Sequence, residues 1–281
     1  MGEGAARLRC ELCEVLCVLI LKLILVPSFL VLLTLAGKRW GPSVAGWLAG
    51  LPVVAGPILF FLSVEQGVLF AANAAVAALS AVLASVAFSV AYSHAAQRRP
   101  WPLALLFALF AWSGSALCLS ALPGSTPLSL VVSIFTLIAA PRLFPRAQVL
   151  VQARAVTLPE LGCRVLAGAA LTVAVTFVAG TVGSGWSGLL AVFPVLGIVL
   201  AVFSHRTQGP AFAASLLQGM ATGLYSFVAF CLILSVALPH VGIPIAFTVA
   251  VVASLIAQVA SKRHLVYPSS GLPLDAARVK P

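Results

Sequence analysis

The chain has 281 residues, of which 62% are hydrophobic and only 8% are charged. Soluble domains carry about 25% charged residues, so this composition excludes a soluble globular protein, which could not cover itself with polar surface. The net charge of +10 would suit nucleic acid, but the basic residues stand in short segments between long apolar runs. We therefore expect a membrane protein with no nucleic-acid partner.

Apolar runs long enough to cross a bilayer follow one another along the chain. A helix needs about 20 residues to cross about 30 Å of hydrocarbon. The nine runs of this kind cover residues 15–36, 43–63, 67–92, 101–121, 125–141, 164–182, 185–204, 209–237 and 242–261. In lipid the backbone must satisfy its own hydrogen bonds, as a helix does. The sequence predicts an all-α, polytopic membrane protein with about nine transmembrane helices and the lipid bilayer as its first partner.

The first run, 15–36, is longer than the roughly 7–15 apolar residues of a signal peptide, so we interpret it as a span. With nine spans, one side of the membrane receives most of the basic residues and the other receives only Arg7 and Arg9. The basic side carries Lys38, Arg39, Arg98, Arg99, Arg142, Arg146, Arg154, Arg206, Lys262, Arg263, Arg278 and Lys280. Cytoplasmic segments are the basic ones, so we expect the N-terminus outside and the C-terminus in the cytoplasm.

Two segments, GWLAGLPVV from Gly46 and GLLAVFPVL from Gly188, share one pattern. The offset that places Gly46 on Gly188 also aligns further residues without a gap. The aligned pairs include Gly41 with Gly183, Pro52 with Pro194, Gly67 with Gly209, and Lys22 with Arg164. The repeated unit therefore contains four spans, in residues 22–121 and again in 164–261.

The fifth span, 125–141, has no counterpart in the repeat. Five crossings then separate equivalent points, so the second unit enters the membrane from the opposite side. Inverted repeats of this kind occur in many secondary transporters. The predicted organisation is a four-helix repeat in 1–122, a linker transmembrane helix with a cytoplasmic connector in 123–161, an inverted four-helix repeat in 162–264 and a cytoplasmic tail in 265–281.

The segment GPSVAGWLAGLPVVAGPILFFLSVEQGVLFAANAA and its copy from Gly183 share Gly-x-Leu-Ala-x-x-Pro, followed by a loop and a helix of small residues. On these residues the chain resembles the GlpM-like family of small four-helix bacterial inner-membrane proteins, and a related family of similar size. The resemblance covers both halves and implies an inner-membrane location for a fused pair of units. It implies no activity and no functional residue. Four-span units that pair antiparallel are also similar in fold to the small multidrug exporters.

Small residues at every fourth position mark a predicted helix-packing face in each repeat. They are Gly41, Ala45 and Ala49 in the first repeat and Gly183, Ser187 and Ala191 in the second. This spacing lets helix backbones approach closely where lipid offers no hydrophobic drive.

Pro52 and Pro194 occupy equivalent places inside two spans. Proline in a helix interior leaves the carbonyl four residues earlier without its amide partner, here at Leu48 and Leu190. Matching kinks would place these carbonyls near the middle of the bilayer, where a substrate site or a hinge could use them. The other interpretation is a kink whose carbonyls bond to neighbouring groups.

Polar residues gather in the third and eighth spans. The candidates for substrate binding are Asn73 and Ser80 in the third span and Ser215, Gln218, Thr222 and Tyr225 in the eighth. The last four share one helical face. An unpaired amide in lipid is costly, so this face either lines a substrate cavity or bonds to an adjacent helix.

Ionisable residues inside spans are functional candidates. Lys22 and Arg164 are matched cations near the start of each repeat, where they would suit an anionic substrate or a lipid headgroup, or would extend to the interface. Glu65 and His205 end two spans on opposite faces. They could gate a path or carry protons, since histidine titrates near neutral pH, or they could solvate a tight turn.

Catalytic motifs are missing from the sequence. It has no His, Asp and Glu cluster with metal-ligand spacing, no Gly-x-Ser-x-Gly and no P-loop, and Asp275 is its single aspartate. We expect no enzymatic activity, no metal and no cofactor. Cys10, Cys13 and Cys17 share a helical face that suits packing or lipidation, with a metal or redox pair as the alternative.

These observations favour an integral inner-membrane transporter or permease that uses alternating access between inverted repeats. Its substrate is unknown, and a small molecule or a lipid-like compound fits. Without an ATPase motif, a gradient or a partner would drive it, and a homodimer stays open as its oligomeric state. The alternative is a non-transporting scaffold or accessory subunit of an envelope biosynthesis or export complex.

Overall fold

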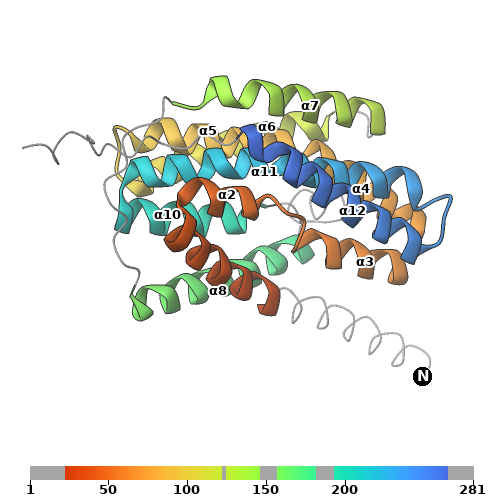
Figure 1. Ribbon diagram of the computed structural model, residues 1–281, viewed down its shortest axis with the longest axis horizontal. Helices are drawn as coiled ribbons and strands as arrows, with labels where there is room; N and C mark the ends of the chain where they lie inside the picture. Colours follow the sequence, from red (N-terminus) through yellow and green to blue (C-terminus); the bar gives the residue numbers. More distant parts are fainter. Residues whose placement is uncertain (1–22, 122–124, 146–156, 182–192, 265–281) are drawn as a thin grey trace, which may run out of the picture.

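The computed structural model describes residues 23–121, 125–145, 157–181 and 193–264, and within these ranges the chain is helical without strands. The helices are Leu23–Trp40, α2 (Pro42–Ala49), α3 (Ala55–Glu65), α4 (Val68–Ser80), α5 (Val82–Ala96), α6 (Trp101–Ser120), α7 (Thr126–Leu143), α8 (Leu158–Thr181), α10 (Val195–Gln208), α11 (Pro210–Ala237), α12 (Ile243–Ser261) and the short 3-10 helix η1 (Lys262–His264). Figure 1 shows most of them lying along one long axis. The all-helical prediction is confirmed.

Seven helices in the described ranges are long and apolar enough to cross a membrane. They are Leu23–Trp40, Val68–Ala96 (α4 and α5 together), α6, α7, Leu158–Val175 within α8, α11 and α12. The helices α2, α3 and α10 are shorter, with 8, 11 and 14 residues. The chain is therefore a multi-pass membrane protein. The predicted count of nine spans and the repeat architecture stay predictions.

Glycine and proline set where several helices begin. Gly67 and Gly209 have φ of 91° and 92° and stand directly before α4 and α11. This left-handed backbone suits glycine, which has no Cβ to clash. Proline occupies the first turn of α2, α6, α7, α11 and α12, where its missing N–H leaves no hydrogen bond unmade.

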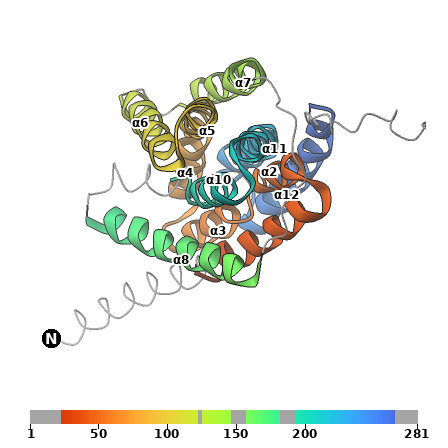
Figure 2. The ribbon, with the colours of Figure 1, turned by 90° about the vertical axis from the view of Figure 1, so that its left-hand side faces the viewer.

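The centre of the bundle is α11, which has 28 residues and packs against α2, α4, α5, α7, α10 and α12. Figure 2 shows it surrounded by these helices. Its side chains Leu217, Phe230 and Leu234 are fully buried. The outer helices instead expose large apolar side chains, such as Phe135 on α7 at 73%, as expected where lipid replaces water.

Helices α2 and α11 meet at what we call the central crossing, formed by Gly46 on α2, Gly50 directly after α2, and Gly219 and Gly223 on α11. A methyl group added to any of the four would overlap backbone atoms of the facing helix. Each pair has Gly-x-x-x-Gly spacing, which lets transmembrane helices approach until their backbones touch. The predicted packing residues Ala45 and Ala49 are buried nearby, but glycines form the contact itself.

Helix ends rich in Lys and Arg meet at one end of the bundle, here called the basic end. The Tyr92 hydroxyl near the end of α5 lies 3.3 Å from His205 Nδ1 near the end of α10. His94 Nε2 donates to the Leu143 carbonyl at the end of α7, at 2.8 Å. The described cations at or beside these ends are Lys38, Arg39, Arg98, Arg99, Arg142, Arg164 and Arg206. Positive charge therefore gathers at this end of the described bundle.

Candidate functional site

The predicted single span 43–63 is two helices, α2 and α3, separated by a short break around Pro52. The Leu48 carbonyl, which Pro52 deprives of its helical partner, accepts a hydrogen bond from the Leu51 amide at 3.1 Å. The Ser226 hydroxyl of α11 donates to the Gly223 carbonyl of its own helix at 2.8 Å and lies 3.4 Å from the Gly50 carbonyl. These bonds match the interpretation of a break whose carbonyls bond to neighbouring groups.

Gln258 of α12 also supports this break. Its Nε2 donates to the Trp47 carbonyl at 2.8 Å, and the Trp47 indole donates to the Ser261 hydroxyl at 3.0 Å. Gln258 is 4% exposed, and its Oε1, like the hydroxyl of buried Ser254, has no partner in the described structure. Sequence reasoning did not select Gln258 or Ser254. Their placement one helical turn apart in a largely apolar helix was the available signal.

The predicted polar face of α11 lies inside the bundle. Ser215 and Thr222 are buried, while Gln218 and Tyr225 are half-buried. The Thr222 hydroxyl donates to the Gln218 carbonyl of its own helix at 3.1 Å. None of the four lines the pocket described below.

The two polar residues predicted on the third span do not join that face. Asn73 of α4 is exposed. The Ser80 hydroxyl donates to the Ala77 carbonyl of its own helix at 2.8 Å. The structure therefore leaves Asn73 at the surface and Ser80 bonded within its own helix, whereas Ser215 and Thr222 of α11 are buried.

The remaining predicted residues are dispersed. Pro194 is buried directly before α10, and Leu190, whose carbonyl it was expected to free, lies outside the described residues. His205 contacts the buried Tyr92 ring edge to face, with centroids 5.9 Å apart. Glu65 ends α3, and its side chain lies outside the description, as does the whole of Lys22.

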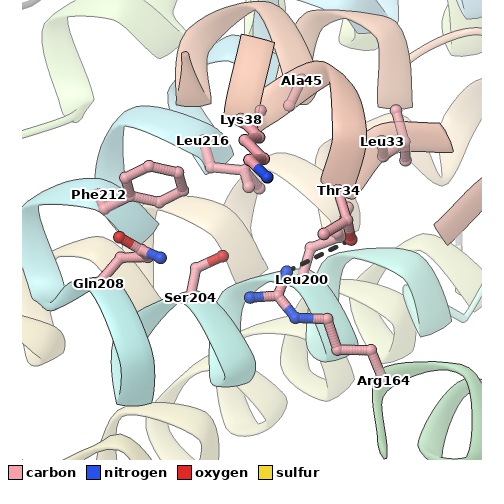
Figure 3. A pocket seen from close by; sticks show the side chains of 11 residues that line it. Leu33, Thr34, Lys38, Ala45, Arg164, Leu200, Ser204, Gln208, Phe212 and Leu216 are labelled. Carbon is pink, nitrogen blue, oxygen red and sulfur yellow. Dashed lines mark hydrogen bonds between the residues drawn. The ribbon is translucent and has the colours of Figure 1, made fainter. Parts of the chain in front are cut away.

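A pocket at the basic end gathers polar side chains from different helices (Figure 3). Its polar lining residues are Thr34, Lys38, Arg164, Ser204 and Gln208, and its other lining residues are Leu33, Gly37, Ala45, Leu200, Phe212 and Leu216. Its volume is about 20 Å³, which is room for about one water molecule. We call it the basic-end pocket.

Arg164 forms the floor of the basic-end pocket and is 3% exposed. Its Nη2 lies 2.6 Å from Glu160 Oε1, one helical turn earlier on α8. The guanidinium also reaches the hydroxyls of Thr34 at 3.4 Å and Thr207 at 3.5 Å, and it lies over the Phe203 ring at 5.7 Å. A buried cation persists because it is paired and hydrogen-bonded. Prediction singled out Arg164, and the structure gives it these partners.

Two further groups face the same space. Ser204 is 0% exposed, and its hydroxyl has no hydrogen-bond partner in the described structure. Figure 3 shows the Lys38 amine and the Ser204 hydroxyl turned toward the space above Arg164. Sequence reasoning missed both residues for this role, because they lie in different halves of the chain and only the packing of Leu23–Trp40 near α10 brings them together.

The fold and these sites define the chain as a multi-pass α-helical membrane protein. A scan against protein-family models and searches of curated proteins and of solved structures find no match to the chain. The resemblance to the GlpM-like family therefore stays a prediction. Within the described residues, no group of three or more His, Cys, Asp and Glu side chains could hold a metal ion.

Proposed function

We propose that the chain is an inner-membrane transporter or permease with nine spans, in which two inverted four-helix repeats alternate access to a central site. The observation that carries this proposal is the match between Gly67 and Gly209, which the sequence repeat aligns with each other. Their φ angles are 91° and 92°, and each stands directly before a helix. Equal backbone at equivalent positions supports a shared ancestral unit.

Helix boundaries support the same pairing. Val68 begins α4 and Pro210 begins α11, while Trp101 begins α6 and Ile243 begins α12. Both pairs of starting residues have the separation in the sequence that places Gly46 on Gly188. Packing follows the pairing as well. Helix α6 packs on α5 in the first repeat, as α12 packs on α11 in the second. Between the repeats, α12 contacts α3 and α6 contacts α10.

The direction of the helices supports inversion. Figure 1 draws α4 and α11 starting from opposite ends of the bundle. The Tyr92 to His205 contact places the end of α5 beside the start of α11, so these equivalent helices run antiparallel. The central crossing then joins one repeat to the other and is the natural pivot for relative movement.

The scaffold alternative rests on a specific observation. The basic-end pocket holds about one water molecule, and the polar α11 residues Ser215 and Thr222 are buried against other helices. A polar face that serves only helix packing would look the same. Under this alternative no conformational cycle exposes it.

Sidedness tests the inverted repeat. In a chain whose six cysteines are replaced by alanine, Val64→Cys and Arg206→Cys place thiols at equivalent exposed positions. An impermeant maleimide should label Val64→Cys in intact cells and Arg206→Cys only after permeabilisation. Labelling of both from one side would overturn the repeat and the transporter proposal with it.

Accessibility of the α11 face tests transport against scaffolding. Cysteines at positions 215 and 218, and at 73 on α4, should react with a water-soluble maleimide at rates that change when an ion or pH gradient is imposed. Phe135→Cys on the exposed face of α7 is the control and should stay unreactive in lipid. Uniform protection at 215 and 218 under all conditions would favour the scaffold.

A further inference from the structure

We propose that the basic-end pocket binds one oxygen of an oxyanion, such as a phosphate or carboxylate group, through Lys38, Arg164 and Ser204. The three side chains come from the helix Leu23–Trp40, α8 and α10 and line one cavity. The binding site does not depend on transport, because a scaffold could hold the same ligand.

The charge around the basic-end pocket selects an anion. Arg164 is balanced by Glu160, whereas Lys38 has no ion pair with any described residue. The described ranges contain one further acidic residue, Glu65, which ends α3. The pocket therefore carries one uncompensated positive charge, which repels cations and attracts anions.

Unused hydrogen-bond donors point the same way. The Ser204 hydroxyl is fully buried without a partner among the described residues, and Arg164 Nε is buried without one too. The Ser204 hydroxyl faces the cavity that Lys38 and Arg164 also line (Figure 3). Ionised oxygens accept such donors and form shorter, stronger hydrogen bonds than neutral acceptors do.

The size and place of the basic-end pocket limit how the ligand binds. A volume of about 20 Å³ admits a single oxygen rather than a whole phosphate. Lys38 is exposed, so the mouth opens beside it at a helix end. A lipid headgroup at the interface and a small anion from water can both reach this mouth, and both present the same chemistry.

Two binding measurements on the full chain separate these sources. In detergent, the thermal midpoint is followed against inorganic phosphate, with chloride at matched ionic strength as the reference. In nanodiscs, the midpoint is compared between phosphatidylglycerol and phosphatidylcholine bilayers. Stabilisation in either arm supports an oxyanion site; a response only to phosphatidylglycerol assigns the headgroup, and a response only to phosphate assigns the soluble anion.

Matched variants locate the effect. Lys38→Gln should weaken the anion response about tenfold, the value of one charge-assisted hydrogen bond, and Lys38→Arg should retain it. Arg39→Gln removes the same charge from the next residue, which does not line the pocket, and should leave the response unchanged. Ser204→Ala should weaken the anion response without lowering the midpoint measured in chloride.

Two results would overturn the site. One is the absence of any anion response by the unmodified chain in both arms. The other is an equal loss in Lys38→Gln and Arg39→Gln, which would assign the response to diffuse surface charge. Ser204→Ala keeps the test decisive if a Lys38 variant does not fold, since an unchanged response would remove the hydroxyl from the site.

Discussion

At the central crossing two backbones meet through four glycines, whereas at the basic-end pocket several helices leave a space lined by charged and hydroxyl side chains. Both places join segments from the two halves of the chain. The crossing lacks side chains where the helices touch, so it stabilises by close approach. The basic-end pocket keeps a buried cation whose stability depends on its partners. The first is sensitive to added volume and the second to lost charge.

The largest expected effect is at the central crossing. Gly223→Val would place a side chain against the backbone of Trp47 and Gly50, which should destabilise the fold by about 3 kcal/mol and lower the thermal midpoint in detergent. Gly114→Val is the matched control, because a Cβ at Gly114 meets no atom within 4 Å. Equal midpoints for the two variants would refute close backbone contact.

The next effect concerns the partner of Arg164. Glu160→Gln leaves a buried guanidinium without its counter-charge. The free energy of unfolding should fall by about 2 kcal/mol, less than for a fully buried pair, because Glu160 itself is partly exposed. The double variant Glu160→Gln with Arg164→Met should recover part of this loss, since no buried charge then remains. Denaturation in detergent measures both, and a single variant as stable as the unmodified chain would remove the ion pair from the account of the basic-end pocket.

Support of the helix break gives a smaller effect. Gln258→Leu removes the hydrogen bond to the Trp47 carbonyl and should destabilise by about 1 kcal/mol. Thr248→Val is the comparison, because the Thr248 hydroxyl bonds to Pro244 of its own helix. The thermal midpoint in detergent is measured for both variants. Equal effects would mean that the hydrogen bond between helices contributes no more than one within a helix.

The smallest expected effects on stability come from removing one serine hydroxyl in each of the two regions. Ser226→Ala removes a buried hydroxyl that donates to the Gly223 carbonyl at 2.8 Å and lies 3.4 Å from the Gly50 carbonyl near the central crossing. This change should lower stability by about 0.5 kcal/mol. Ser204→Ala removes a buried hydroxyl without a partner among the described residues and should not lower stability in the absence of anion. A loss at Ser204 equal to that at Ser226 would indicate an unrecognised partner in the basic-end pocket.

The positions of the last two predicted spans follow from apolar length. The predicted 209–237 is α11 at Pro210–Ala237, and the predicted 242–261 is α12 at Ile243–Ser261. The break in 43–63 was less visible, since Pro52 predicts a kink without saying whether the helix resumes in line. The residues that contact the break, Ser226 and Gln258, belong to helices in the other half of the chain.

The packing faces and the candidate site were harder to predict for the same reason. Gly41, Ala45 and Ala49 have the right spacing, but spacing within one helix does not say which face meets a neighbour, and Gly46 and Gly50 make the contact. Arg164 was recognisable as a cation in an apolar run. Lys38 and Ser204 were not, because their shared pocket exists only once three distant helices have packed.

The helix that touches most of the others, α11, follows α2, α4, α5 and α7 in the sequence. Membrane proteins are synthesised from the N-terminus, so α2, α4, α5 and α7 enter the bilayer before α11 is made. Until then Gly46 and Gly50 lack the helix that they contact in the complete bundle. Completion of the bundle therefore waits for α11, and a chain cut short before residue 210 would lack the element against which the earlier helices pack.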